Sequence, residues 1–432
     1  MTVAIFIGSL LGAMALGMPI AYALLVCGVS LMLYLPSTGA IGSFDAQILA
    51  QRFVEGADNF PLLAVPFFLL AGEFMNAGGL SRRIVQMAMA WVGHFRGGLG
   101  YVAVIAAIVM ASISGSAVAD TAALSAILIP MMREAGYRLD RSAGLIASGG
   151  IIAPVIPPSI GFIIFGVAGN VSITKLFLAG IVPGILMGVA IGLTWWWLAR
   201  REEVPRASKL TLHDRLKATA DGAFALALPV VIIGGMKFGV FTPTEAAVVA
   251  AVYAFVVGMY IYRELQWPKL YGLVLAAGKT TAVVMFLVAA AMVSAWLITV
   301  ANIPAEVAAM LAPVMDNKTL LMFTMMVLIV IVGTALDFAP TVLILTPVLM
   351  PVVMKAGIDP VYFGVLFIMN NAIGLITPPV GTVLNVVCGV ARITMDQAFK
   401  GVLPFLLAQL AVLFLLVFVP EIVTVPLKWW LR

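Results

Sequence analysis

The sequence predicts an all-α polytopic membrane protein built from two inverted repeats, and three observations support that fold class. First, 63% of the 432 residues are hydrophobic and only 10% are charged, whereas about a quarter of the residues in soluble domains are charged. Second, two long apolar stretches are each interrupted by paired prolines, Pro157-Pro158 and Pro378-Pro379. Third, these pairs lie 221 positions apart, and other helix-breaking residues repeat at the same spacing.

The first interruption, GGIIAPVIPPSIG at residues 149–161, lies in a run without charged residues from Ser142 to Val171. Proline removes a backbone donor, and lipid offers no water to replace the lost hydrogen bond. A broken helix is therefore tolerated at membrane depth only where it is buried in protein or lines a cavity. The second interruption, NNAIGLITPPVGT at 370–382, repeats this feature. Two broken helices in corresponding halves are typical of a transporter's binding site.

The first elements of the chain are two spans, which Gly17–Pro19 divides, followed by a polar amphipathic piece at 45–58. A third span is expected at 60–77. The segment 80–94 has apolar residues at helical spacing but is too short and too polar to cross. We expect it to lie along the membrane interface.

The next apolar run, residues 97–132, is split by the polar sequence ASISGSAVAD at 111–120. Each half has about a dozen residues, which is too short to cross a bilayer alone. The pattern predicts a re-entrant hairpin with its tip at 112–121. A span at about 180–198 follows the first broken helix and ends in Trp195–Trp197, and tryptophans are enriched at membrane interfaces.

The basic residues predict the orientation. The linker at 200–217 carries Arg200, Arg201, Arg206, Lys209, Arg215 and Lys217. By the positive-inside rule this linker is cytoplasmic. Arg133, Arg138 and Arg141 precede it by two crossings and agree with that orientation. The first hairpin therefore enters from the cytoplasm.

The second half repeats the plan. Its expected elements are spans at 222–240 and 243–262, an amphipathic piece at 267–279, a span at 280–301, a second hairpin at 319–354 broken at 333–341, the second broken helix and a last span at 401–423. Each half makes five full crossings in this interpretation, and an odd number places the two repeats in opposite orientations. The second hairpin then enters from the periplasmic side.

The repeat also predicts how the chain is divided. At the offset of 221, Pro130 matches Pro351, Gly136 matches Gly357, Gly180 matches Gly401 and Pro183 matches Pro404. Transport segments are expected at 96–179 and 318–400, and scaffold segments at 1–95, 180–317 and 401–432. The family resemblance given below implies an elevator-type arrangement, in which the transport segments move against the scaffold.

Polar residues gather at the hairpin tips and the broken helices. They are Ser112, Ser114, Gly115, Ser116, Asp120 and Thr121 at the first tip, Gly333, Thr334, Asp337 and Thr341 at the second, Ser159 at the first break, and Asn370, Asn371, Thr377, Thr382 and Asn385 at the second. Hydroxyls, amides and carbonyls at helix ends suit a hard cation such as Na⁺, and half-helix N-termini suit an anionic substrate. An ionisable group at membrane depth is a functional hypothesis by default.

Structural roles for the same residues stay open. Single Ser, Thr or Gly residues in membrane helices often serve close packing. Asp120 and Asp337 can also be N-caps of the returning half-helices. Lys237, Lys279 and Lys355 lie near span ends, where a lysine can reach the interface.

Several function classes are not expected. Cys27 and Cys388 lie far apart in apolar runs, and the two histidines, His94 and His213, form no cluster of metal ligands. No GxxxxGK[ST] loop for ATP is present. We find no nucleophile–base pair, so we do not expect an enzyme or a nucleic-acid-binding protein.

Specific stretches carry a resemblance to a known family. They are LGMPIAYAL, PLLAVPFFLLAGEFMNAGGLSRRIV, SISGSAVADTAALSAILIPMM, IIAPVIPPS, LDFAPTVLILTPVLMP and NNAIGLITPPVGTVLNV. Together they resemble the large membrane subunit, DctM type, of tripartite ATP-independent periplasmic (TRAP) transporters, over essentially the whole chain. The resemblance implies an elevator-type secondary transporter of the bacterial inner membrane that imports an organic acid by Na⁺ symport.

The resemblance also implies partners and sites. A periplasmic substrate-binding protein delivers the substrate, and a small four-helix membrane subunit is expected as a separate chain, because this sequence begins directly with the large subunit. The implied Na⁺ sites lie near Ser112, Ser114, Gly115, Pro154 and Pro157, and near Gly333, Thr334, Asp337, Thr377 and Pro378. Substrate is expected between the tips, where the candidates are Ser116, Asp120, Ser159, Thr341, Asn371 and Thr382. The alternative is a stand-alone carboxylate or ion symporter of similar fold.

Overall fold

The computed structural model describes residues 2–39, 43–201 and 208–431, and these residues form helices without any β-strand. Within this part of the chain, nine helices are long and apolar enough to cross a membrane. The predicted all-α fold class is therefore confirmed. Arg206 of the predicted cytoplasmic linker lies outside the described residues.

The described residues of the first half form ten α-helices. They are α1 Thr2–Ala15, α2 Ile20–Tyr34, α3 Ala46–Ala57, α4 Ala64–Ala77, α5 Leu80–Val92, α6 Gly98–Ser114, α7 Ala117–Glu134, α8 Leu139–Gly150, α9 Ile160–Gly169 and α10 Ile173–Ala199. Short 3₁₀ turns at Leu35–Thr38 and Phe60–Leu63 extend α2 and precede α4.

The second half also contains ten. They are α11 Leu212–Lys237, α12 Pro243–Val256, α13 Trp267–Val300, α14 Ile303–Leu311, α15 Lys318–Ala335, α16 Phe338–Lys355, α17 Pro360–Gly374, α18 Thr382–Ala391, α19 Met395–Phe418 and α20 Glu421–Trp430. A π-helical turn at Val257–Ile261 extends α12, and a 3₁₀ turn at Ala312–Val314 follows α14.

The internal repeat is visible in the helix boundaries. The two ends of α7, Ala117 and Glu134, correspond at the offset of 221 to the two ends of α16, Phe338 and Lys355. In the same way α6, α8, α9 and α10 correspond to α15, α17, α18 and α19 within a few residues. Of the residues that revealed the repeat in the sequence, the two proline pairs and Gly136 with Gly357 lie between helices. Pro130, Gly180 and Pro183 and their counterparts lie inside α7, α10, α16 and α19.

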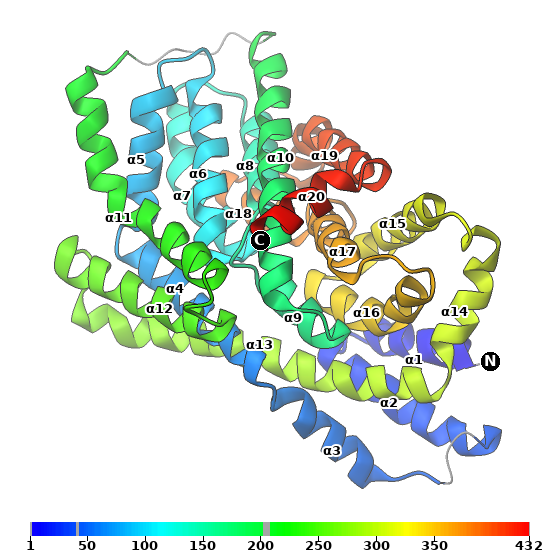
Figure 1. The fold of residues 1–432 in the computed structure, drawn as a ribbon. Helices are drawn as coiled ribbons and strands as arrows, with labels where there is room; N and C mark the ends of the chain where they lie inside the picture. The colour runs from blue at the N-terminus through cyan, green and yellow to red at the C-terminus, as the bar shows by residue number, and fades with distance from the viewer. Residues whose placement is uncertain (1, 40–42, 202–207, 432) are drawn as a thin grey trace.

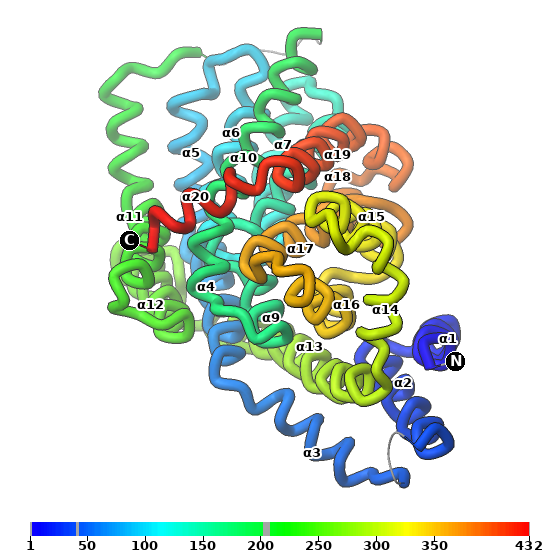
Figure 2. Tube along the Cα trace, turned by 45° about the vertical axis from the view of Figure 1, so that its right-hand side comes forward, coloured from blue at the N-terminus to red at the C-terminus, as the bar shows by residue number. Residues whose placement is uncertain are grey.

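The long helix α13 runs along one side of the molecule, where it packs against α2, α3 and α4 (Figures 1 and 2). We predicted two elements here, an amphipathic piece and a separate span, and that prediction is wrong. Pro268 stands at the start of α13, and no proline follows before its end at Val300. In the first half, by contrast, Pro61 lies in the turn that separates α3 from α4.

The first hairpin also differs from its predicted form. Its arms, α6 and α7, have 17 and 18 residues, longer than expected, because most of the polar sequence at 111–120 is helical. Only Gly115 and Ser116 form the turn. The hairpin itself is present, and its re-entrant position in a membrane stays a prediction.

The two repeats pack across one another. Helix α9, which follows the first break, packs against α16 and α17 of the second repeat. Helix α18, which follows the second break, packs against α7 and α8 of the first. This exchange brings each broken helix to the hairpin of the other repeat. The division into scaffold and transport segments stays a prediction.

Candidate functional site at the two interruptions

The first break is completely enclosed. Between the end of α8 at Gly150 and the start of α9, the segment Ile151–Ser159 forms turns, and every residue in it is buried. Ser159 caps α9: its hydroxyl accepts a hydrogen bond from the Phe162 amide (3.1 Å) and donates one to the Pro154 carbonyl (2.5 Å). We predicted Ser159 as a substrate contact, but its hydroxyl already makes both of these hydrogen bonds to the backbone of its own segment.

A serine–aspartate pair closes the first tip. The Ser114 hydroxyl donates to Asp120 Oδ1 at 2.5 Å and accepts from the Ser116 amide at 3.1 Å. Asp120 is only 1% exposed, and its Oδ2 has no hydrogen-bond partner among the described residues. The N-cap of α7 is Ser116, which accepts from the Ala119 amide. Asp120 therefore lies in the first turn of α7 and stabilises the hairpin tip through its bond to Ser114. The N-cap role that we considered for Asp120 is wrong, because Ser116 occupies that position.

The first tip and the first break are in direct contact. Gly115 has a left-handed φ of 64°, and a Cβ atom on it would lie 2.4 Å from the Pro158 carbonyl oxygen. A Cβ atom on Gly150 would likewise overlap the Thr121 hydroxyl oxygen. Only glycine combines this backbone conformation with so close an approach. The structure thus places Gly115, one of the predicted cation-site residues, against Pro158, the neighbour of the predicted Pro157.

Ser112 and Pro154 belong to the same region. The Ser112 hydroxyl donates to the Val109 carbonyl one helical turn earlier at 2.6 Å, and Pro154 lies within the buried break. The first predicted cation cluster is therefore a packed set of helix ends.

The second tip lacks the side-chain capping bond that is present at the first tip. Asp337 stands at the N-cap position of α16 without making a side-chain capping bond. Its Oδ1 instead accepts from the Thr382 hydroxyl at the start of α18, at 3.3 Å. The Thr341 hydroxyl, fully buried, donates to the Asp337 carbonyl at 2.9 Å. The second tip is thus tied to the second break through a carboxylate and a hydroxyl.

Other residues at the second interruption bond to their own helices. Thr334 donates to the Ile331 carbonyl (2.8 Å) and Thr377 to the Ile373 carbonyl (2.9 Å). A Cβ atom on Gly374 would lie 2.7 Å from the Gly333 carbonyl oxygen, so α15 and α17 cross closely here. Thr377 and Pro378 are half-buried, in contrast to the enclosed first break.

Two asparagines beside the second tip hold unpaired amide oxygens. Asn371 donates to the Phe338 carbonyl at 2.6 Å and Asn370 to the Met326 carbonyl at 2.7 Å. Both are 1% exposed, and the Oδ1 atom of each has no partner in the described part of the chain. Buried polar groups without partners are rare in proteins. Such oxygens fit the ligand set that hard cations prefer.

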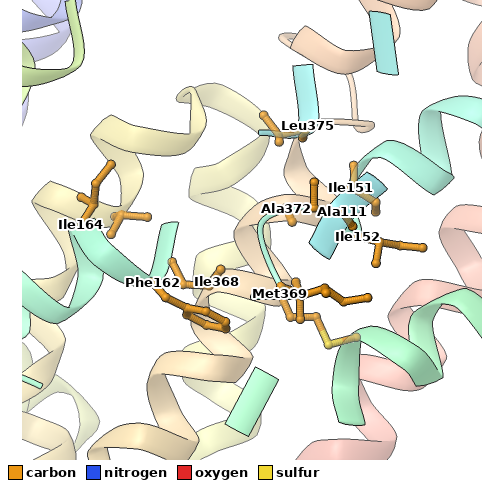
Figure 3. Close-up of a cluster of buried hydrophobic side chains, with 14 of the residues drawn as sticks. Ala111, Ile151, Ile152, Phe162, Ile164, Ile368, Met369, Ala372 and Leu375 are labelled. Atoms are coloured by element: carbon orange, nitrogen blue, oxygen red, sulfur yellow. The ribbon is translucent and has the colours of Figure 1, made fainter. Parts of the chain in front are cut away.

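The two interruptions belong to one body. A Cβ atom on Gly161, at the start of α9, would lie 2.7 Å from the Phe338 ring at the second tip. Figure 3 shows Ala111 of α6, Ile151 and Ile152 of the first break, Phe162, and Leu375 of the second break in one buried apolar cluster. The hypothesis that the interruptions meet is consistent with this arrangement.

The site contains features that the sequence alone did not reveal. The Ser114–Asp120 pair spans six positions across a turn, a spacing with no regular helical meaning. Asn370 was noted as polar, but its unpaired oxygen depends on how α17 faces α15. Among the described residues, no group of three His, Cys, Asp or Glu side chains could hold a metal ion. A cation here would depend on hydroxyl, amide and backbone oxygens together with a single carboxylate at a tip.

Comparison with known proteins identifies the family. The family described as "Tripartite ATP-independent periplasmic transporter, DctM component" matches residues 7–422. The chain belongs to the DctM family. The resemblance seen in the sequence is therefore confirmed.

Relatives of this DctM chain are large permease proteins of TRAP transporters. It is 58% identical over 429 residues to the Escherichia coli 2,3-diketo-L-gulonate TRAP transporter large permease protein YiaN, covering 99% of this chain and all of that protein. It is 36% identical to the Pseudomonas aeruginosa C4-dicarboxylate protein DctM, covering 89% of this chain and 90% of that one. These relatives carry the names of transporters.

Two further comparisons concern the organisation and the fold. The isethionate permease DctMQ of Oleidesulfovibrio alaskensis is 37% identical, and the match covers 95% of this chain but only 64% of that protein. The solved structure of the Alcanivorax borkumensis YdaH transporter matches with a TM-score of 0.69 at 17% identity, covering 93% of this chain and 98% of that chain. This second likeness concerns the fold alone.

Proposed function

We propose that this DctM-family chain is the large permease subunit of a TRAP transporter that imports an organic acid across the bacterial inner membrane by Na⁺ symport. Its partners are a periplasmic substrate-binding protein and a small four-helix membrane subunit. The observation that carries the proposal is the pair of hairpin tips and broken helices, repeated at an offset of 221 and packed into one body. Paired broken helices are the sites where transporters bind substrate and coupling ion.

The substrate class that we propose is an oxidised sugar acid. The relative at 58% identity is named for 2,3-diketo-L-gulonate, whereas the C4-dicarboxylate relative is 36% identical. The N-termini of α9 and α18 would face the carboxylate, because the positive end of a helix dipole stabilises an anion.

The chain's own groups have distinct roles in this proposal. At the second tip, Asp337, Thr382 and the unpaired Asn371 oxygen would hold a Na⁺ ion. At the first tip, the backbone around Gly115, shaped by the Ser114–Asp120 pair, would hold another. Cation binding would order the tips and complete the substrate site, after which the transport segments would move across the scaffold.

Uptake by proteoliposomes tests the proposal. The chain is reconstituted with its small subunit, and the binding protein, labelled 2,3-diketo-L-gulonate and a Na⁺ gradient are supplied outside. We expect uptake that stops when choline replaces Na⁺ and when the binding protein is omitted. Unchanged uptake in choline would contradict the cation coupling. Undiminished uptake without the binding protein would instead support the stand-alone symporter.

A further inference from the structure

A cavity of about 560 Å³ lies where the ends of α5, α6 and α10 come together, away from the two interruptions. Its lining includes Phe95, Arg96, Tyr101, Ile105, Trp196 and Arg200. Helices α5 and α10 both pack against α6, and Figure 1 shows the three side by side near the segment that leads from α10 to α11. The volume lies in the range of small-molecule sites, about 300–1,000 Å³.

The cavity walls are held in place without a ligand. The indole nitrogen of Trp195 donates to the Gly97 carbonyl at 2.9 Å, and this tryptophan is 1% exposed. A Cβ atom on Gly100 would lie about 2 Å from the Trp195 ring, so only glycine lets α6 and α10 approach here. The space beside them is therefore a preformed feature of the fold.

The mouth of the cavity combines aromatic rings with a cation. Phe95 and Trp196 are 49% and 44% exposed. The Arg200 guanidinium carbon lies 3.7 Å from the centre of the Trp196 ring. A guanidinium stacked on its face keeps its N–H donors directed outward from its edge, where a phosphate can accept two of them. Within the described residues, Arg200 makes no side-chain hydrogen bond or ion pair.

Two basic residues lie close enough to His94, beside the cavity, to affect its ionisation. The His94 ring centre lies 4.3 Å from that of Phe95. Desolvation, together with the positive charges of Arg215 and Lys209, lowers the pKa of His94. By the positive-inside rule, these basic segments face the cytoplasm, where the leaflet surface is negatively charged.

We propose that this cavity binds an anionic phospholipid of the inner leaflet, with the phosphate at the edge of Arg200 and an acyl chain against Ile105 and Phe95. An apolar interior, an aromatic rim and a cation at one end match an amphipathic anion at the membrane interface. Because the walls come from α5, α6 and α10, the lipid would link helix α5 to helix α6 of the first hairpin. This site goes beyond the proposed transport function.

The chain offers a matched control in the neighbouring residue. Arg201 stacks on Trp197 with its guanidinium carbon 3.9 Å from the ring centre, as Arg200 does on Trp196, but it does not line the cavity. Arg200→Gln and Arg201→Gln thus remove the same charge one position apart. Ile105→Trp fills the apolar part and leaves every charge in place.

The test is native mass spectrometry of the full-length protein in detergent, titrated with phosphatidylglycerol, phosphatidylcholine or inorganic phosphate. We expect retained phosphatidylglycerol, an apparent affinity about tenfold weaker in Arg200→Gln, the equivalent of one charge-assisted hydrogen bond, and little change in Arg201→Gln. Ile105→Trp should abolish binding, with thermal unfolding confirming that this variant folds.

Three outcomes would overturn the proposal. Equal losses in the two arginine variants would mean a diffuse charge effect, and equal binding of phosphatidylcholine would remove the anionic requirement. Full displacement by inorganic phosphate would identify a free-anion site instead of a lipid site.

Discussion

At the first interruption every residue from Ile151 to Ser159 is buried, whereas at the second Thr377 and Pro378 are half-buried and Pro379 is exposed. The first uses serines to begin both of its returning helices, α7 and α9. At the second, Asp337 makes no capping bond, and α18 begins after Gly381 in a left-handed conformation with φ of 45°.

We infer from this difference that the two copies of one repeated plan have different mechanical roles. At the first interruption the Ser114 and Ser159 hydroxyls both bond within their own segments, although Asp120 Oδ2 has no partner among the described residues. The second leaves a carboxylate and amide oxygens with few partners. We therefore expect the first interruption to be the more rigid one and the second to change its conformation more when cation and substrate bind. Four predictions test this comparison.

The largest expected effect comes from an added methyl group at each tip. Gly115→Ala places a Cβ against the Pro158 carbonyl in a left-handed conformation, whereas Gly333→Ala meets its nearest neighbour, Asn371 Oδ1, at 3.5 Å. Backbone strain of this kind costs about 1–3 kcal/mol. We expect Gly115→Ala to lose nearly all uptake and to unfold at lower temperature, and Gly333→Ala to keep most of both. Equal effects would contradict the difference in rigidity.

The two aspartates should separate stability from coupling. Asp120→Ala leaves the buried Ser114 hydroxyl without its acceptor, which costs about 1–3 kcal/mol. We expect a lower unfolding temperature for Asp120→Ala and an unchanged one for Asp337→Ala. Asp120→Asn retains an acceptor oxygen and should recover much of the stability. A full loss of stability in Asp120→Asn would mean that the negative charge itself is required.

Asp337→Ala should act on cation dependence. If the carboxylate is a Na⁺ ligand, its removal raises the half-saturating Na⁺ concentration about tenfold, as expected for the loss of one ionised partner. Initial uptake rates at increasing Na⁺ give this value, and Asp316→Ala, near the end of the α14 arm, is the matched control. The same Na⁺ dependence in Asp337→Ala and wild type would assign Asp337 a structural role.

The smallest effect is expected at Thr382. Thr382→Val keeps the shape and removes the hydroxyl that donates to Asp337 at 3.3 Å. A net loss of about 0.5–1.5 kcal/mol corresponds to a change of roughly two- to tenfold. We expect the half-saturating Na⁺ concentration to rise by a factor near the twofold end of that range. The control, Thr324→Val on α15, should leave it unchanged. An effect larger than that of Asp337→Ala would place the cation on Thr382 instead.

Part of this structure was predictable from sequence because helix breakers act locally. Proline fixes φ and removes a backbone donor wherever it stands, so Pro157-Pro158 and Pro378-Pro379 located both breaks, and their spacing indicated the repeat. The continuous helix α13 was missed because polar residues near Lys279 were interpreted as an element boundary without a breaker to enforce it.

The internal arrangement of the site was less predictable because it depends on contacts between distant segments. The clustering of polar residues indicated both tips, but not that Asp120 would pair with Ser114 while Asp337 would face Thr382. The first pair depends on the tight turn at Gly115 and Ser116, and the second joins residues 45 positions apart in the chain. Residue type and spacing alone carry little information on such packing.

Solute protection of the two tips tests the central claim directly. Cys27 and Cys388 are first replaced by serine, and single cysteines are then introduced at Ser116 and Thr334, both partly exposed, with exposed Ser43 as control. The rate of maleimide labelling is measured in the reconstituted system with and without Na⁺ and organic acid. The account predicts that the two together slow labelling at Ser116→Cys and Thr334→Cys and leave Ser43→Cys unchanged. Labelling at either tip that does not respond to the solute would contradict a binding site shared by both interruptions.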